Sequence, residues 1–439
     1  MSDRVLTQPQ IHPLQPGFTL IHYYRPSPVV VADVWVRAGS AMETPDQGGM
    51  AHLLEHMIFK GSANLQPGDF DRLVENQGGL TNAATSYDYA HFFITTAVNQ
   101  LPAALPALGE LLLGASLPAP ELERERQVVL EELRQAQDNP DWVAYQHLLQ
   151  GLYGSHPYGR SILGSPQHLQ THTVEALRQF HQRQYQPANL TVVVAGGLDL
   201  DPCRALVERS FCHFSPPPPA PPLPPVPRPQ PSADTSIAPH RIALQLPYVE
   251  QTRLLLGWSG PGVDRRREDG QNPEMETPGG NLREILALEL WAMVLATGRS
   301  SPWVQILRED RQWIHSISTN FLLQQQASLF SVSIWLDTDQ LDRVEAWIVD
   351  NLCHWQTHLL DGDSLQRAKG LLRNDYIFAT ETHGQLAGLY GYYNTIADLN
   401  WAVTYFEVLA QVQSEDLRQV MERYLRPQAY TAVMVRAQP

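Results

Sequence analysis

The segment 48–56, Gly-Gly-Met-Ala-His-Leu-Leu-Glu-His, combines residue types that can hold and use a metal ion. On a helix, His52 and His56 lie four positions apart and share one face, so their imidazoles can point at one place. Two neutral imidazoles suit Zn²⁺, which binds histidine nitrogen at about 2.0–2.1 Å. Glu55 lies close to that face, where its carboxylate could take a proton from a metal-bound water. This HxxEH order is the inverse of the HExxH zinc-protease motif, although two ordinary histidines of an amphipathic helix remain an alternative.

A catalytic zinc site that keeps one position open needs a third protein ligand. The best candidate lies in the charge-rich segment 121–133, where Glu125 and Glu132 are seven positions apart and share one face of a predicted helix. The expected apolar stripe of this helix consists of Val128, Val129 and Leu133. Spacing alone favours a solvated helix face, so it does not identify Glu132 as a ligand.

The composition limits the classes of partner. The 439 residues include 31 basic and 46 acidic side chains, which gives a formal net charge of −15. This charge argues against a general nucleic-acid binder, whose phosphate contacts need a basic face, and suits either a cationic partner or a well-solvated surface. Lysine occurs only at Lys60 and Lys369, a bias that has no functional explanation at this level. The three cysteines lack CxxC spacing and support neither a disulfide framework nor a thiolate metal site.

The sequence carries no targeting or membrane signal of the usual kind. Its first ten residues have no apolar signal core, and no run of about 18 apolar residues occurs. We therefore expect a soluble, cytoplasmic protein without membrane insertion. An organellar matrix or stroma remains open if a transit peptide has been removed.

A proline-rich segment divides the chain. The segment 215–232 contains 11 prolines in 18 residues and predicts an extended polyproline II linker. Its flanks, 1–214 and 233–439, show a similar order of predicted elements. We expect two homologous α+β domains, each an α/β roll with an antiparallel-rich sheet covered by helices, as after an ancient duplication. The polar segment 265–281 predicts a mobile loop.

The predicted elements follow from β-branched and aromatic runs, helical periodicity and capping residues. Strands are predicted at 18–25, 29–37, 81–86, 89–98 and 190–195 in the first flank, and at 241–246, 253–258, 314–321, 329–335 and 430–435 in the second. Helices are predicted at 50–60, 69–77, 101–115, 120–137, 174–184 and 282–296, with three or four more before the last strand.

Together these motifs resemble the pitrilysin or insulysin family, the M16 inverzincin metallopeptidases, and above all its short two-domain processing peptidases of mitochondrial and bacterial type. In that family a glutamate ligand follows HxxEH at the spacing at which Glu132 follows here, and another acid precedes it as Glu125 does. The resemblance implies one Zn²⁺ in the catalytic domain, held by His52, His56 and Glu132. It also implies that Glu55 is the general base and that Glu125 is a further acid that holds the catalytic site.

Further matches extend the resemblance along the chain. The stretch 78–88 resembles the family's GGxxNAxTSxD sequence, in which the strand carrying Asn82 and Ala83 is an edge onto which the substrate adds as an extra strand. An ordinary strand after a Gly-Gly turn is the alternative interpretation. The segments 298–301 and 307–309 look like the family's signature in the second domain.

One departure from the family concerns the second domain. In self-sufficient members an Arg and, seven positions later, a Tyr hold the substrate carbonyl, whereas here Arg308 is followed at that spacing by His315. Either His315 substitutes for the phenol, or Arg308 is structural and a second subunit supplies the pair, which we favour. The helix at 282–296 has no histidine, so we expect no zinc in the second domain.

The resemblance implies a zinc endopeptidase that cleaves unfolded peptides, and the acidic balance favours basic peptides such as targeting sequences. It further implies a homodimer, or a heterodimer with a related M16 subunit, because the chain resembles one half of the long members that enclose their substrate. Two alternatives remain open. One is a non-catalytic structural or docking subunit of a peptidase complex. The other is a zinc-stabilised binding protein, which would need four protein ligands where the sequence offers three.

Overall fold

The computed structural model describes residues 8–214, 239–247, 249–263 and 281–438. The predicted linker 215–232 and nearly all of the predicted loop 265–281 lie outside these residues. The chain forms two compact units. Unit 1 comprises Met1–Arg134, Ser161–Pro225 and Phe378–Val403, and unit 2 comprises Gln135–Arg160, Val226–Ile377 and Thr404–Pro439. Each unit therefore draws on both halves of the sequence, 1–214 and 233–439.

The sheet of unit 1 has six strands in the order β1-β2-β6-β3-β5-β4, and only the β2–β6 pair is parallel. The central strands β3 and β6 are rich in valine and buried almost throughout, because helices cover both faces of the sheet there. At the edge, β4 pairs with β5 alone. The strands are β1 (Gln10–Gln15), β2 (Phe18–Tyr24), β3 (Val29–Val36), β4 (Leu80–Thr85), β5 (Ala90–Ala97) and β6 (Leu190–Gly196).

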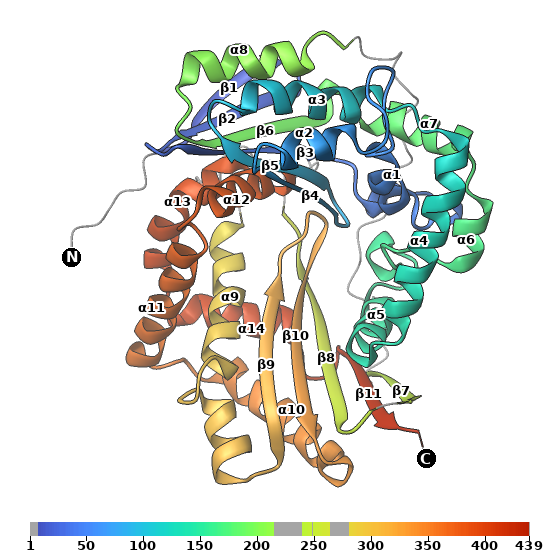
Figure 1. Cartoon of the computed structure of the whole chain (residues 1–439). Helices are drawn as coiled ribbons and strands as arrows, with labels where there is room; N and C mark the ends of the chain where they lie inside the picture. The colour runs from blue at the N-terminus through green and yellow to red at the C-terminus, as the bar shows by residue number, and fades with distance from the viewer. Residues whose placement is uncertain (1–7, 215–238, 248, 264–280, 439) are drawn as a thin grey trace, which may run out of the picture. The chain divides into compact units, whose positions relative to one another are not determined.

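The helices of unit 1 lie on both faces of its sheet. Figure 1 shows α3 and α8 over one face, while α12, from the second half of the sequence, covers β3 and β6 on the other. The helices of this unit are α1 (Met50–Ile58), α2 (Asp69–Glu75), α3 (Leu101–Gly114), most of α4 (Ala119–Gln137), α6 (Pro166–Thr171), α7 (Val174–Gln184), α8 (Leu200–Phe211) and α12 (His383–Ile396).

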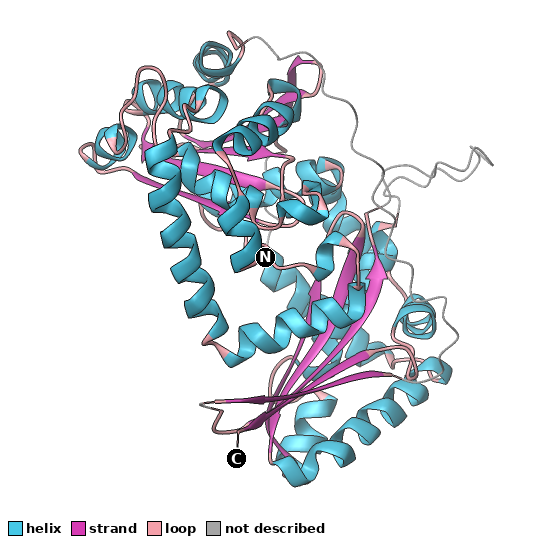
Figure 2. Ribbon diagram, turned by 90° about the vertical axis from the view of Figure 1, so that its right-hand side faces the viewer, coloured by secondary structure: helices cyan, strands magenta, loops and turns pink. Residues whose placement is uncertain are grey.

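The sheet of unit 2 repeats this arrangement in five strands. Its order β7-β11-β8-β10-β9, with only the β7–β11 pair parallel, matches β2-β6-β3-β5-β4 of unit 1 in connection and direction. The mixed α/β fold with two antiparallel-rich, helix-covered sheets, which the sequence predicts, is thereby confirmed (Figure 2). The strands are β7 (His240–Leu246), β8 (Thr252–Pro261), β9 (Ile314–Leu322), β10 (Ala327–Leu336) and β11 (Thr431–Ala437).

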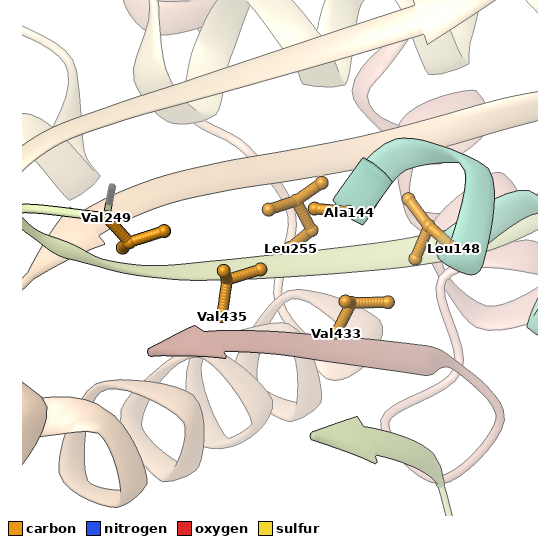
Figure 3. Close-up of a cluster of buried hydrophobic side chains, with 6 residues drawn as sticks. All are labelled: Ala144, Leu148, Val249, Leu255, Val433 and Val435. Atoms are coloured by element: carbon orange, nitrogen blue, oxygen red, sulfur yellow. The ribbon is translucent and has the colours of Figure 1, made fainter. Parts of the chain in front are cut away.

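One face of the second sheet is covered by α5 (Pro140–Tyr153), a helix from the first half of the sequence. Its Ala144 and Leu148 pack into an apolar cluster whose other buried members are Val249, Leu255, Val433 and Val435 (Figure 3). Gly257 of β8 permits this approach, since a Cβ atom there would lie 3.0 Å from the Leu148 side chain. The other helices of unit 2 are α9 (Leu282–Ala296), α10 (Leu341–Thr357), α14 (Ser414–Tyr424), nearly all of α11 (Gly362–Phe378) and most of α13 (Leu399–Gln411).

The element predictions differ from the structure in several places. The sequence reading missed β1, α5, α6 and α8, and five helices rather than three or four lie between β10 and β11. The stripe predicted for α4 is wrong at Val128, which is 49% exposed, whereas Val129 and Leu133 are buried as expected. Successive residues of a helix differ by about 100° in direction, so Val128 points away from the face that carries Val129. None of the described helices is long and apolar enough to cross a membrane.

Candidate metal centre

Helix α1 is fixed at its beginning by a buried acid. Gly49 adopts a left-handed conformation (φ +84°) directly before the helix. The Glu43 carboxylate accepts hydrogen bonds from the Gly49 amide (3.2 Å) and the Ala51 amide (2.8 Å). These amides belong to the first turn, whose N–H groups have no carbonyl acceptors within the helix. The negative charge of Glu43 also interacts favourably with the positive end of the helix dipole. The orientation of the two histidines that follow is therefore set by this anchored turn.

His52 and His56 lie one turn apart on α1, with ring centroids separated by 4.8 Å. The Nε2 atoms of both rings are 3.7 Å from the same oxygen, Oε2 of Glu132 on α4. The structure thus brings together the three ligands that the resemblance implied, and among the described residues they form the one group of at least three such side chains with donor atoms close enough to share a metal ion.

This donor set fits Zn²⁺. Two imidazole nitrogens and one carboxylate oxygen are ligands that zinc commonly takes, and the donor atoms of a tetrahedral site lie about 3.4 Å apart. The three donor atoms here all lie within 4.8 Å of one another, so small side-chain movements would bring them to the separation that a bound Zn²⁺ requires. The Glu132 side chain is 45% exposed, which leaves one side of this group of residues open to solvent.

The His52 imidazole is in the form that binds metal. Burial lowers its pKa to about 4, and the neighbouring His56 acts in the same direction. At neutral pH the ring therefore carries no proton on one of its nitrogens, and a lone pair is free for a cation.

Glu55 lies on the same helix, next to the ligand face. Its carboxylate accepts a hydrogen bond of 2.5 Å from the hydroxyl of Thr85, the last residue of β4. Burial raises the pKa of the Glu55 carboxyl above its ordinary value, while the Thr85 hydrogen bond and the nearby His56 act in the opposite direction. A buried carboxyl group with a raised pKa is suited to accept and return protons near neutral pH.

Glu125 lies behind His56 and is 8% exposed. Its Oε2 atom is 3.2 Å from Nδ1 of His56, and its Oε1 atom is 2.8 Å from the ammonium of Lys60. The sequence analysis missed Lys60 and Thr85 as residues of the site. The only signal for Lys60 in the sequence was its rarity, and Thr85 had only its place in the stretch 78–88.

Asn82 and Ala83 lie on β4, which forms one of the two edges of the first sheet in the described residues. Asn82 is exposed, and its side-chain oxygen accepts a hydrogen bond of 2.9 Å from the Ala83 amide. The same strand reaches the catalytic candidate Glu55 through Thr85. A peptide added along this edge would thus extend the strand whose last residue contacts the candidate base.

Arg308 and His315 belong to unit 2. Arg308 lies in a π-helical segment, Val304–Asp310, and donates from Nε (3.0 Å) and Nη2 (2.6 Å) to Glu309. His315 is the second residue of β9 and is exposed, with Nε2 3.1 Å from Oδ1 of Asp337. Both side chains are engaged with neighbouring acids in the structure, and their assignment to substrate stays a prediction.

Known proteins resemble this chain in sequence, and solved structures resemble it in fold. The family model described as "Insulinase (Peptidase family M16)" matches residues 19–166, and the one described as "Peptidase M16 inactive domain" matches residues 171–372. Zinc protease PqqE of Helicobacter pylori is 27% identical over 411 residues, which cover 93% of this chain and 88% of that protein. A probable mitochondrial-processing peptidase subunit beta of Schizosaccharomyces pombe is 33% identical over 204 residues, which cover 46% of this chain and 45% of that protein. The crystal structure of a protease from Helicobacter pylori has a TM-score of 0.84 at 23% identity and covers 98% of this chain and 100% of that one.

Proposed function

Since the chain belongs to the M16 family of zinc proteases, we propose that it is a zinc-dependent endopeptidase that cleaves unfolded peptides. The observation that carries this proposal is the convergence of His52, His56 and Glu132 on one place, with Glu55 beside them on α1. A structural metal site would be closed by four protein ligands, and three with an exposed side are typical of a catalytic one.

The residues of the site have separate tasks. His52, His56 and Glu132 would hold Zn²⁺, which supplies Lewis acidity that polarises a carbonyl and activates water near neutral pH. Glu55 takes a proton from the attacking water and later delivers it to the leaving amine. Thr85 holds the carboxylate of Glu55 in place through its hydroxyl. Glu125 fixes the ring of His56 from behind.

The edge strand β4 supports the choice of unfolded peptides as substrates. Main-chain pairing with an edge strand binds an extended peptide without reading its sequence, and the small side chain of Ala83 lets it approach. Asn82 would have to release the Ala83 amide when the peptide pairs. The net charge of −15 supports basic peptides, such as targeting sequences, as the preferred class.

We further propose that two subunits form the working peptidase, either as a homodimer or as a heterodimer with a related M16 chain. The support is the replacement of the family tyrosine by His315, whose imidazole is shorter than a phenol. A partner subunit would then supply the Arg/Tyr pair, and Arg308 would remain in its ion pair with Glu309.

Metal analysis and cleavage of a quenched peptide test the catalytic assignment. Glu55→Gln should keep zinc and lower turnover by about 10²–10⁴-fold, because the general base is lost while the ligands remain. Glu131→Gln is the matched control, since Glu131 is exposed on α4 next to the ligand Glu132 and pairs with Arg134. Unchanged turnover in Glu55→Gln would refute the assigned base. A wild-type chain that binds zinc but cleaves no peptide, alone or with related subunits, would support the docking subunit instead.

A further inference from the structure

The carboxylate of Glu125 is shared between two partners, one on each oxygen. Oε2 is 3.2 Å from Nδ1 of His56, and Oε1 is 2.8 Å from Nζ of Lys60. Lys60 follows α1 directly after Phe59, four positions beyond His56, so both partners approach from the same end of one helix. A series of side-chain contacts thus runs from Lys60 through Glu125 to His56, which is a candidate metal ligand.

Burial makes this arrangement depend on Lys60. The side chain of Glu125 is only 11% exposed, so little water is available to its charge, and that of Lys60 is partly buried at 26% exposed. A buried carboxylate is costly unless it is paired and hydrogen-bonded on both oxygens. Without the ammonium, Oε1 would lack its charged partner, and the carboxylate would gain by turning toward solvent or another donor.

The identity of the cation matters as well as its charge. The chain has 31 basic residues, of which only Lys60 and Lys369 are lysines, so arginine is its usual cation. A guanidinium presents a planar fork that matches both oxygens of a carboxylate, whereas an ammonium acts as a compact point charge. At position 60 an arginine would therefore compete for Oε2 of Glu125, the oxygen on which His56 depends.

We propose that Lys60 is a positioning residue of the metal centre, whose ammonium holds Oε1 of Glu125 so that Oε2 stays on Nδ1 of His56. A proton on Nδ1, donated to Glu125, leaves the lone pair on Nε2, which faces Glu132 at 3.7 Å. Lys60 thereby sets both the tautomer and the direction of one ligand without touching the metal. This inference rests on the proposed function, because it assumes that His56 is a zinc ligand.

Zinc affinity, measured by competition with a chromophoric chelator, tests the proposal. Lys60→Met and Lys60→Arg should each weaken zinc binding by about tenfold, the lower end of the range for residues that support a ligand. Glu125→Gln, one step closer to the ligand, should weaken it at least as much. Lys369→Arg is the matched control, because Lys369 lies in unit 2, where its ammonium donates a hydrogen bond of 2.9 Å to the Ala410 carbonyl.

Circular dichroism and thermal unfolding of the zinc-free proteins show whether each variant folds, so a general loss of structure is separated from a loss of metal affinity. If Lys60→Arg binds zinc as tightly as the wild type, the argument from the single-oxygen contact is overturned. If Lys60→Met does so, the ammonium has no role in positioning. A wild-type chain that binds no zinc at all would instead overturn the proposed function.

Discussion

Replacing Gly391 by alanine should destabilise unit 1 by about 2 kcal/mol, because α12 and β3 approach each other through this glycine. A Cβ atom at position 391 would lie 2.0 Å from Nε1 of Trp35 and 2.4 Å from two other atoms of the indole. The indole is 3% exposed, and it stacks on His91 at 4.4 Å and contacts Tyr89 at 4.7 Å between ring centroids. It therefore has no free space into which it can retreat.

Two effects of opposite sign decide the magnitude. Alanine is favoured over glycine inside a helix by about 1 kcal/mol, which would stabilise α12. Overpacking a buried contact costs about 1–3 kcal/mol, and a 2.0 Å contact requires a shift of about 1 Å, at the upper end of that range. The clash is larger than the gain in helix propensity, so the net change is a loss.

Gly388 provides a matched control on the same helix. It lies three positions before Gly391, and a Cβ atom there would meet no heavy atom within 4 Å. Gly388→Ala should therefore stabilise unit 1 by about 0.5–1 kcal/mol. Because the chain has two units, a single unfolding curve can combine the unfolding of both. Amide hydrogen exchange of β3 and α12 instead reports the stability of unit 1 alone. If Gly391→Ala slows exchange as Gly388→Ala does, the packing argument is refuted.

Three further predictions concern the metal centre. Removing zinc with a chelator should abolish peptide cleavage and lower the unfolding temperature by an amount that depends on free zinc, and calorimetry at several zinc concentrations checks this. Glu132→Gln should purify without zinc, which metal analysis checks. Its zinc-free form should unfold at the same temperature as the zinc-free wild type, because the 45% exposed side chain contributes little packing, and thermal unfolding measures this. In the zinc-free protein, the pKa of His52 lies near 4 when folded and near its ordinary 6.5 when unfolded. Since the unfolded chain takes up the proton first, stability should fall by about 3 kcal/mol at most as the pH drops from 6.5 to 4, and His52→Asn should flatten this part of a urea-denaturation pH profile.

The sequence predicted the local parts of the site better than the parts that depend on tertiary contacts. The relative position of the two histidines in HxxEH follows from helix geometry alone, because residues four apart on a helix share a face. His52 and His56 are neighbours in the structure as expected. Glu132 was different. Its partners lie on another helix, so spacing alone favoured a solvated face and only the resemblance to a family indicated a ligand.

Lys60 and the packing helices show why the rest could not be predicted. The ion pair of Lys60 with Glu125 joins residues 65 positions apart, and no local pattern encodes it. The assignment of α5 and α12 to sheets formed by the opposite half of the sequence depends on matching shapes, such as Leu148 against Gly257 and Trp35 against Gly391. Strand β1 was missed because it lies at an edge and is largely exposed, so it lacks an apolar pattern.

Helices α5 and α12 each pack on the sheet formed by the other half of the sequence, so that neither 1–214 nor 233–439 contains a complete unit. A fragment ending in the proline-rich stretch would keep the three candidate zinc ligands but lose α12. The face of its sheet that carries Trp35 would then be an exposed apolar surface. The complementary fragment would lose α5 and expose Val433 and Val435 in the same way. The two pieces are thus expected to aggregate when produced singly and to rescue each other when produced together.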